Sequence, residues 1–456
     1  MYCAGPHHHY ENTRELGVPV PPFCVRFHPT NTRTVALADE EGAVVLLDYD
    51  ARGGACGVDA GRGGRGQNAR GGIAHGGGGS SPRVSGALHC HNNAIFDLAW
   101  SPHTHHVITA SGDQTCRLTD VSSRELVLIC RGHTGSVKAL SARPSDPNVF
   151  ASCGRDGCVC IFDVRRGGEP VMGLSGIHSV EAGSRKRRRA APTHGVSAVQ
   201  YLDEHTLATG GASDGTVKIW DGRLAGARKA KGGLRLSSPL HTLTPGESTS
   251  ESGERTGPSR AYGVIQLAVD PAGRKLLVSS SDHQIHLYDR VRPSFGEVAA
   301  FYGHSAGSFY LKAAFSPDGR FIVSGSTDAK AYMWEVERSG APVACLRGHL
   351  GEVTGVDWSP HDFFDLVTCS DDCTVKRWSV VRGAGDWDQE SGTHGSIEKE
   401  AEAAAEGGQV DACEDTDPIP LPPSMLSPVT PLATTRRPRA ASESRQASVH
   451  EYFSRI

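Results

Sequence analysis

Residues 348–378 read GHLGEVTGVDWSPHDFFDLVTCSDDCTVKRW, and this stretch decides the fold. After an opening Gly-His it holds three short runs rich in β-branched and aromatic residues and separated by turn residues, at 353–358, 366–369 and 374–378. Short runs of this composition bounded by turns are typical of β-strands. The stretch therefore predicts a small sheet, in which the acidic Asp372 precedes the aromatic Trp378 by six positions.

The same spacing of six, from an acidic residue to a bulky one, recurs along the chain. The other pairs are Glu41 with Leu47, Asp113 with Thr119, Asp156 with Phe162, Asp214 with Trp220, Asp282 with Tyr288, and Asp328 with Trp334. A histidine opens most of the units, at His91, His133, His194, His304 and His349. Repeats of about 40 to 45 residues with four short strands each are typical of propeller blades. Seven copies predict an all-β, seven-bladed β-propeller over residues 20–382, with residues 1–19 as a candidate segment for closing the ring.

Wider spacing between some repeats predicts insertions at about 51–86, 166–193 and 224–259. The first is very rich in glycine and the second carries a basic run, and neither composition buries enough apolar surface to order a segment. Residues 383–456 are rich in Pro, Ser, Ala and charge, so we expect a disordered C-terminal tail.

Composition excludes several classes of protein. The 456 residues include 47 Lys and Arg against 51 Asp and Glu, a net charge of −4, which gives no general affinity for nucleic acid or anionic membrane. No signal peptide or long apolar segment is evident, so we expect an intracellular protein without a membrane partner. The thirteen cysteines include no CxxC pair, and we expect buried reduced thiols, with no metal site and no cofactor. Those in strand-like runs are Cys116, Cys153, Cys158, Cys160 and Cys369.

The Gly-His and Trp-Asp signatures around each unit resemble the WD40-repeat family over about residues 20–380. The resemblance implies a structural hydrogen-bond network in each of the last two blades. Its members would be His304, Ser326, Asp328 and Trp334 in blade six, and His349, Ser370, Asp372 and Trp378 in blade seven. His, Ser and Asp together could also form a hydrolase triad, but a catalytic set is needed once, whereas these residues return with each blade. No GxSxG, HExxH or P-loop pattern is present, so we expect no catalytic residue.

Two neighbouring blades end in an aromatic residue followed by Asp-x-Arg. The two boxes are Phe162-Asp163-Val164-Arg165 and Trp220-Asp221-Gly222-Arg223. A guanidinium just beyond a strand end can reach a carboxylate or carbonyl of a partner, although a solvated loop arginine is the simpler alternative. Paired WDxR boxes resemble those of substrate receptors for cullin-4 RING ubiquitin ligases. That resemblance implies docking to the ligase's propeller adaptor, the large subunit of damaged-DNA-binding protein, through Asp163, Arg165, Asp221 and Arg223.

Several runs resemble the Denticleless family more closely, although blade one matches weakly and Thr119 stands where an aromatic residue is usual. These runs are GRDG at 154–157, SFYLK at 308–312, VSGSTD at 323–328, AYMW at 331–334 and TCSDD at 368–372. The resemblance implies a non-catalytic, nuclear substrate receptor. Its partners would be degron-bearing replication and cell-cycle proteins bound to PCNA, which it marks for degradation during replication and the DNA damage response.

Two short motifs outside the repeats fit this interpretation. In the sequence QASVHEYF at 446–453, one face of a helical turn would present Gln446, Val449, Tyr452 and Phe453, which resembles the box that binds PCNA. The run Arg185-Lys186-Arg187-Arg188-Arg189 suits a nuclear import signal, or weak contact with DNA phosphates. A chance match in a long tail is the alternative for the first motif.

The competing hypothesis is a WD40 scaffold for chromatin assembly or histone binding that is not part of a ligase. Such a scaffold could share the propeller, the basic run and the PCNA box. It would have no need of two Asp-x-Arg boxes on adjacent blades, so Arg165 and Arg223 separate the two hypotheses.

Overall fold

The computed structural model describes most of the propeller but not the tail. The described residues are 2–13, 18–49, 82–102, 104–178, 195–223, 229–230, 233–234, 238–246, 248–249, 255–256 and 262–382. All of them belong to the first of two compact units, Met1–Ala401, and the second unit, Glu402–Ile456, lies outside the described residues. No helix of the described part has the length and apolar character needed to cross a membrane.

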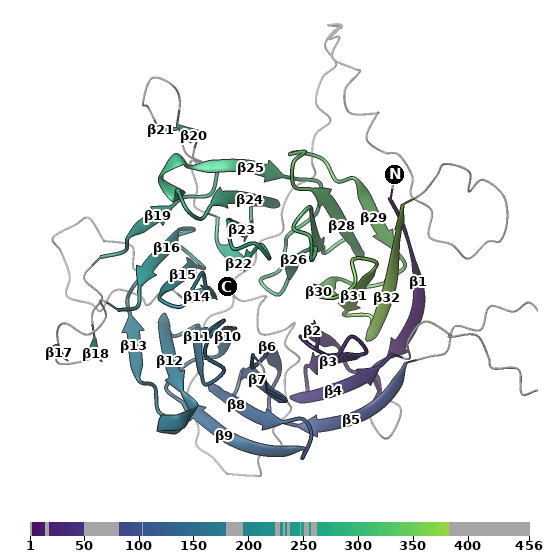
Figure 1. Ribbon diagram of the computed structural model, residues 1–456, viewed down its shortest axis with the longest axis horizontal. Helices are drawn as coiled ribbons and strands as arrows, with labels where there is room; N and C mark the ends of the chain where they lie inside the picture. The colour runs from purple at the N-terminus through teal and green to yellow at the C-terminus, as the bar shows by residue number, and fades with distance from the viewer. Residues whose placement is uncertain are drawn as a thin grey trace, which may run out of the picture. The chain divides into compact units, whose positions relative to one another are not determined.

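In the described part of the chain, seven antiparallel sheets of four strands each are arranged in a ring (Figure 1). From the inner to the outer strand, blade one is β2 (Pro22–Phe27), β3 (Thr34–Asp39), β4 (Ala43–Asp48) and β5 (Arg83–His89); blade two is β6 (Ile95–Trp100), β7 (His106–Ser111), β8 (Thr115–Asp120) and β9 (Glu125–Arg131); blade three is β10 (Val137–Ala142), β11 (Val149–Gly154), β12 (Cys158–Asp163) and β13 (Met172–Ser175); and blade four is β14 (Val196–Tyr201), β15 (Thr206–Gly211), β16 (Val217–Asp221) and β19 (His241–Leu243).

The remaining blades follow the same order. Blade five is β22 (Val264–Val269), β23 (Lys275–Ser280), β24 (Gln284–Asp289) and β25 (Glu297–Phe301); blade six is β26 (Ala313–Phe315), β27 (Phe321–Gly325), β28 (Lys330–Glu335) and β29 (Ala344–Arg347); and blade seven is β30 (Val353–Trp358), β31 (Asp365–Ser370), β32 (Thr374–Arg382) and β1 (Tyr2–Glu11). Two-residue strands pair outside the blades, as β17 (Lys229–Ala230) with β18 (Gly233–Leu234) and β20 (Ser248–Thr249) with β21 (Arg255–Thr256). The predicted all-β, seven-bladed propeller is confirmed.

The ring closes within blade seven. Strand β1 lies antiparallel to β32, with Tyr2 opposite Arg382 and Glu11 opposite Thr374, so segments from the two ends of the described propeller form one sheet (Figure 1). Closure removes the open sheet edge that a linear array of blades would leave.

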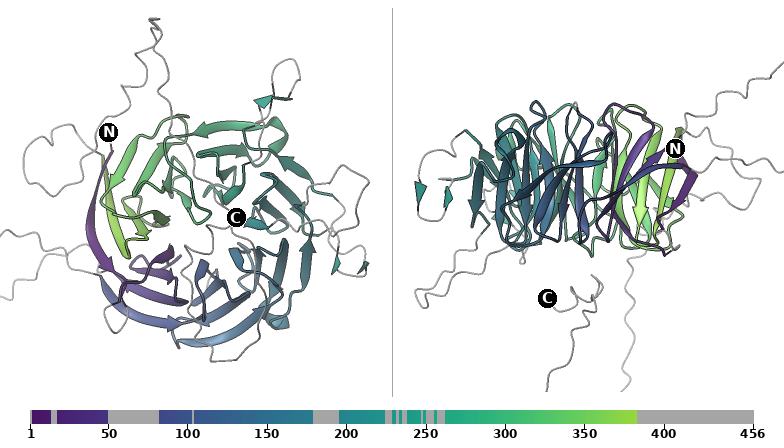
Figure 2. Two further views of the ribbon diagram at one scale, coloured as in Figure 1. Left: turned by 180° about the vertical axis from the view of Figure 1, so that it is seen from behind. Right: turned by 90° about the horizontal axis from the view of Figure 1, so that it is seen from below.

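The core consists of apolar clusters between neighbouring blades, because each sheet packs against the preceding sheet of the ring with one face and against the following sheet with the other (Figure 2). Trp358, Leu366 and Trp378 of blade seven pack with Phe321 and Val323 of blade six. The cysteines expected in strands are free, and all are buried except Cys158, which is partly exposed.

Two outer strands, β13 and β19, lie within ranges that the sequence predicts as insertions, and a third, β5, begins within one. The predicted bounds are therefore too wide. The burial of β5 alternates between exposed and buried positions after an exposed start, since an outer strand packs on one side only. Its sequence consequently lacks the apolar run that marks the inner strands.

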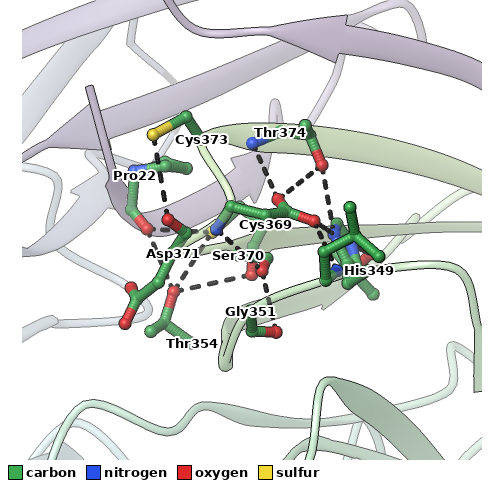
Figure 3. Close-up of polar contacts among 12 residues, drawn as sticks. Pro22, His349, Gly351, Thr354, Cys369, Ser370, Asp371, Cys373 and Thr374 are labelled. Carbon is green, nitrogen blue, oxygen red and sulfur yellow. Dashed lines mark hydrogen bonds and ion pairs between the residues drawn. The ribbon is translucent and has the colours of Figure 1, made fainter. Parts of the chain in front are cut away.

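Blade seven contains the expected hydrogen-bond network, with one correction. His349 Nδ1 lies 3.0 Å from Asp372 Oδ2, and its Nε2 lies 2.7 Å from the hydroxyl of Thr368, which also accepts Trp378 Nε1–H at 2.8 Å. The prediction placed Ser370 at this position. Ser370 instead donates to Gly351 O (Figure 3) and accepts from Asp372 N. Thr368 and Ser370 lie on the same face of β31, but they are roughly 7 Å apart along the strand, so only Thr368 lies within reach of both rings and Ser370, at the strand end, bonds to the turns instead.

The prediction for blade six is wrong at His304. Neither ring nitrogen of His304 has a hydrogen-bond partner within the described residues, and the ring packs edge-on against Trp334 instead. Trp334 donates to Tyr302 O, while Asp328 accepts from the hydroxyl of Tyr332. The carboxylate that would have faced His304 is thus engaged elsewhere.

In blade four the histidine of the network is His178, not the predicted His194. His178 Nδ1 lies 2.9 Å from Asp214 Oδ2, its Nε2 lies 2.9 Å from Thr209, and Trp220 donates to the same threonine. His194 lies outside the described residues. His178 lies inside the range 166–193 that the sequence predicts as an insertion, so the spacing of the repeats does not identify it as a member of the blade.

Candidate functional site

Arg165 is held by the aspartate two residues before it. Asp163 ends β12 and caps a short 3-10 helix, η1 (Val164–Arg166), by accepting the backbone N–H of Arg165 at 3.1 Å. The same carboxylate accepts Arg165 Nε at 2.8 Å and Nη2 at 2.9 Å. Asp146, in the turn before β11, accepts the same Nη2 at 2.9 Å. The spacing of two thus lets one carboxylate fix both the turn and the guanidinium.

Arg223 repeats this arrangement in blade four. Asp221 accepts the backbone N–H of Arg223 at 2.9 Å, Nε at 3.1 Å and Nη2 at 2.9 Å. The side chains of Arg165 and Arg223 are 56% and 67% exposed, respectively. The Nη1 group of each makes no hydrogen bond to a described residue. Both guanidinium groups are therefore oriented by the chain and still present donors to solvent.

The aspartates of the two boxes stay ionised across the physiological range. The side-chain hydrogen bond from Arg165 lowers the pKa of Asp163, and that from Arg223, together with the backbone N–H, lowers the pKa of Asp221 to about 2. The same contacts raise the pKa of each arginine. Two parallel hydrogen bonds between a guanidinium and an ionised carboxylate hold the guanidinium in one orientation more strongly than bonds to a neutral acceptor would.

The two boxes face one cavity. A pocket of about 290 Å³ lies at the boundary of blades three and four, and Asp163, Arg165, Gly222 and Arg223 all line it. The sequence predicts the pairing of the boxes on adjacent blades but not the cavity that both boxes line.

Blade five shows what happens when the spacing changes. In Tyr288-Asp289-Arg290 the arginine follows the aspartate directly, and its Nη1 lies 3.0 Å from Asp203 Oδ2 of blade four. Asp289 accepts the backbone N–H groups of Val291 and Arg292, and the Arg290 side chain bonds to Asp203 and Gly273 O instead. The third arginine is therefore an inter-blade contact.

The other predicted functional segments lie outside the described residues. This applies to the basic run at 185–189 and to the PCNA-binding residues Gln446, Val449, Tyr452 and Phe453. Among the described side chains, no group of three or more His, Cys, Asp or Glu is placed to hold a metal ion.

Comparison with known proteins agrees with the geometry. The family model "WD domain, G-beta repeat" matches residues 82–120, 124–163, 185–221, 296–335 and 340–379. The segment 124–163 runs from β9 of blade two through β12 of blade three, so the sequence repeat is offset from the blade by one strand. The segments 82–120, 296–335 and 340–379 are offset in the same way, so each of these four repeats links two blades.

The chain is also similar to proteins of one particular kind. It is 34% identical over 386 residues to the Denticleless protein homolog of Gallus gallus, covering 80% of this chain and 48% of that protein. It is 35% identical over 394 residues to Denticleless protein homolog A of Xenopus laevis, covering 82% and 50%. The chain is a WD40-repeat propeller of the Denticleless type. The Homo sapiens Denticleless protein homolog is 33% identical over 400 residues, covering 84% of this chain and 49% of that protein. The chain thus spans about half the length of these Denticleless relatives.

Proposed function

We propose that this Denticleless-type chain is the substrate-recognition subunit of a cullin-4 RING ubiquitin ligase. Asp163 with Arg165 and Asp221 with Arg223 would dock the ligase's propeller adaptor. The observation that carries the proposal is that two guanidinium groups, held alike at neighbouring strand ends, line the same cavity. One exposed loop arginine is common, but two that are each fixed by a bidentate carboxylate form a surface prepared for a partner.

Fixing the guanidinium groups before binding favours association. A free arginine side chain loses about 2 kcal/mol of rotamer entropy when it is ordered, and the aspartates have already ordered both side chains. The Nη1 groups remain available for acceptor oxygens of the adaptor. Docking through them would leave the remaining propeller surface for a degron.

The chain would recruit substrates and leave ubiquitin transfer to the conjugating enzyme. The recurring His and Asp residues support this view, because His91, His133, His178 and His349 each bond to an aspartate of their own blade and hold its turns in place. A group used in this way in several blades is structural.

The tail and the basic run complete the proposal. The box at 446–453 would bind PCNA, and tethering would raise the effective concentration of the propeller near substrates on PCNA. Substrates would be marked for degradation in replication and the DNA damage response. The run at 185–189 would direct the chain to the nucleus.

The proposal is tested by measuring the affinity of the purified chain for the purified adaptor. The test variant carries Arg165→Glu and Arg223→Glu, and the matched control carries Arg292→Glu and Arg320→Glu. The control makes the same charge change at two arginines, 67% and 60% exposed, that lie on other blades. We expect a loss of at least a hundredfold for the test variant and less than threefold for the control. No binding by the folded native chain would contradict the proposal and favour a PCNA-associated chromatin scaffold.

A further inference from the structure

The cavity between the two boxes has an apolar wall that the arginine contacts leave unexplained. It is lined by side chains from both blades, namely Val171, Met172, Leu174, Tyr201, Leu207 and Trp220. Its volume of about 290 Å³ is just below the range for small-molecule sites, roughly 300 to 1,000 Å³. A space of this size fits one or two side chains.

Two outer strands stop early at the boundary that holds the cavity. Strand β13 pairs with β12 only as far as Ile161 opposite Met172, and β19 pairs with β16 only as far as Ile219 opposite His241. In blade two the outer strand continues alongside β8 to Asp120, opposite Glu125. The strand ends that carry the two boxes are therefore left uncovered at the same boundary.

The rim of the cavity is rich in arginine. Besides Arg165 and Arg223, it includes Arg143 and Arg166, which form no ion pair with a described carboxylate, while Glu204 contributes an acidic group. Arg165 and Arg223 bind their aspartates through Nε and Nη2, and the Nη1 group of each makes no hydrogen bond to a described residue. An apolar wall below guanidinium donors suits an apolar side chain whose neighbours in the sequence supply acceptor oxygens.

We infer that this cavity is a socket for one apolar side chain of an acidic segment of the adaptor, with Arg165 and Arg223 binding carboxylate or carbonyl oxygens on either side of it. The inference rests on the proposed docking function and adds the specificity element. The arginines would fix the position of the segment, and the socket would select its central residue. Apolar contact at the centre with charge at the rim is the usual anatomy of a protein interface.

The test introduces a charge into the socket without touching either arginine. Val171, 38% exposed, precedes the residue opposite Ile161, and Val127, 51% exposed, occupies the corresponding position before the residue opposite Leu118 in blade two. Val171→Glu is the test variant, and Val127→Glu is its control on a blade without an Asp-x-Arg box. The readout is the affinity of each purified, folded chain for the purified adaptor.

We expect Val171→Glu to weaken binding at least tenfold and Val127→Glu to change it less than twofold. If Val171→Glu does not fold, Val171→Ala replaces it, with an expected loss of threefold or more. Equal binding by the Val171 and Val127 variants, together with loss of binding on reversing both arginines, would overturn the socket and leave the docking proposal intact. Failure of the native chain to bind would overturn both.

Discussion

Replacing Thr368 with valine removes the central hydroxyl of the blade seven network and keeps the shape of the side chain. Thr368 is fully buried, and its hydroxyl contacts His349 Nε2 at 2.7 Å and Trp378 Nε1 at 2.8 Å. Because His349 Nδ1 faces the carboxylate of Asp372, Nδ1 carries the proton, and Nε2 accepts from Thr368. The variant therefore leaves one buried donor and one buried acceptor without a partner.

The expected loss follows from these two groups. Each buried polar group left unsatisfied costs about 1 to 3 kcal/mol, so Thr368→Val should lower the free energy of unfolding by about 2 to 6 kcal/mol. The assay is urea unfolding with the slope compared between variants. Thr368→Ser keeps the hydroxyl and loses one methyl group, so we expect a loss of only about 1 kcal/mol. If the valine variant were as stable as the serine variant, the hydroxyl would not be holding the blade, and the reasoning would be refuted.

Three further predictions concern histidines and the tail. Burial favours the neutral ring of His286, but hydrogen bonds with Asp282 and Glu297 raise its pKa to about 9, so its contribution to the free energy of unfolding should be full below pH 6.5 and lost as the pH rises through 9. Comparing the unfolding of the native chain and of His286→Gln from pH 6 to 10 checks this, and a difference that stays constant with pH contradicts it. Burial lowers the pKa of His304 to about 4, so on acidification the unfolded chain takes up a proton at a higher pH than the folded chain does. At pH 5 the free energy of unfolding of His304→Phe should therefore exceed that of the native chain by on the order of 2 kcal/mol, whereas His349→Phe should be less stable than the native chain at every pH. Equal effects of the two changes in denaturant unfolding would count against this account. Replacing Tyr452 and Phe453 with alanine should weaken binding of the purified chain to PCNA at least tenfold and leave adaptor binding unchanged; undiminished PCNA binding would rule out the box.

The sequence predicts the blades well where every blade has the same structural requirement. Asp372 with Trp378 and Asp214 with Trp220 mark strand ends because the same turn and ring are needed in each blade. It predicts less where a position depends on the exact depth of a residue along its strand. Thr368 and Ser370 both lie in β31, on the same face, and both carry a hydroxyl, so only the position along the strand decides which one meets His349.

The candidate site shows the same division. The spacing of Asp163 and Arg165 predicts an exposed guanidinium beyond a strand end, and the structure adds that the aspartate holds it. The cavity could not be predicted, because it is formed by side chains of two blades whose relative placement, like the ends of β13 and β19, is not marked in the sequence. Outer strands carry little apolar periodicity, so their ends leave no clear mark in the sequence.

The most direct test of the central claim is hydrogen–deuterium exchange of the folded chain with and without the adaptor. The account predicts slower exchange at 164–166, 171–175 and 222–223, which surround the two arginines, and no change at 292–295 of blade five. Protection confined to the opposite turns, such as 348–352 of blade seven, with none at the boundary of blades three and four, would contradict it.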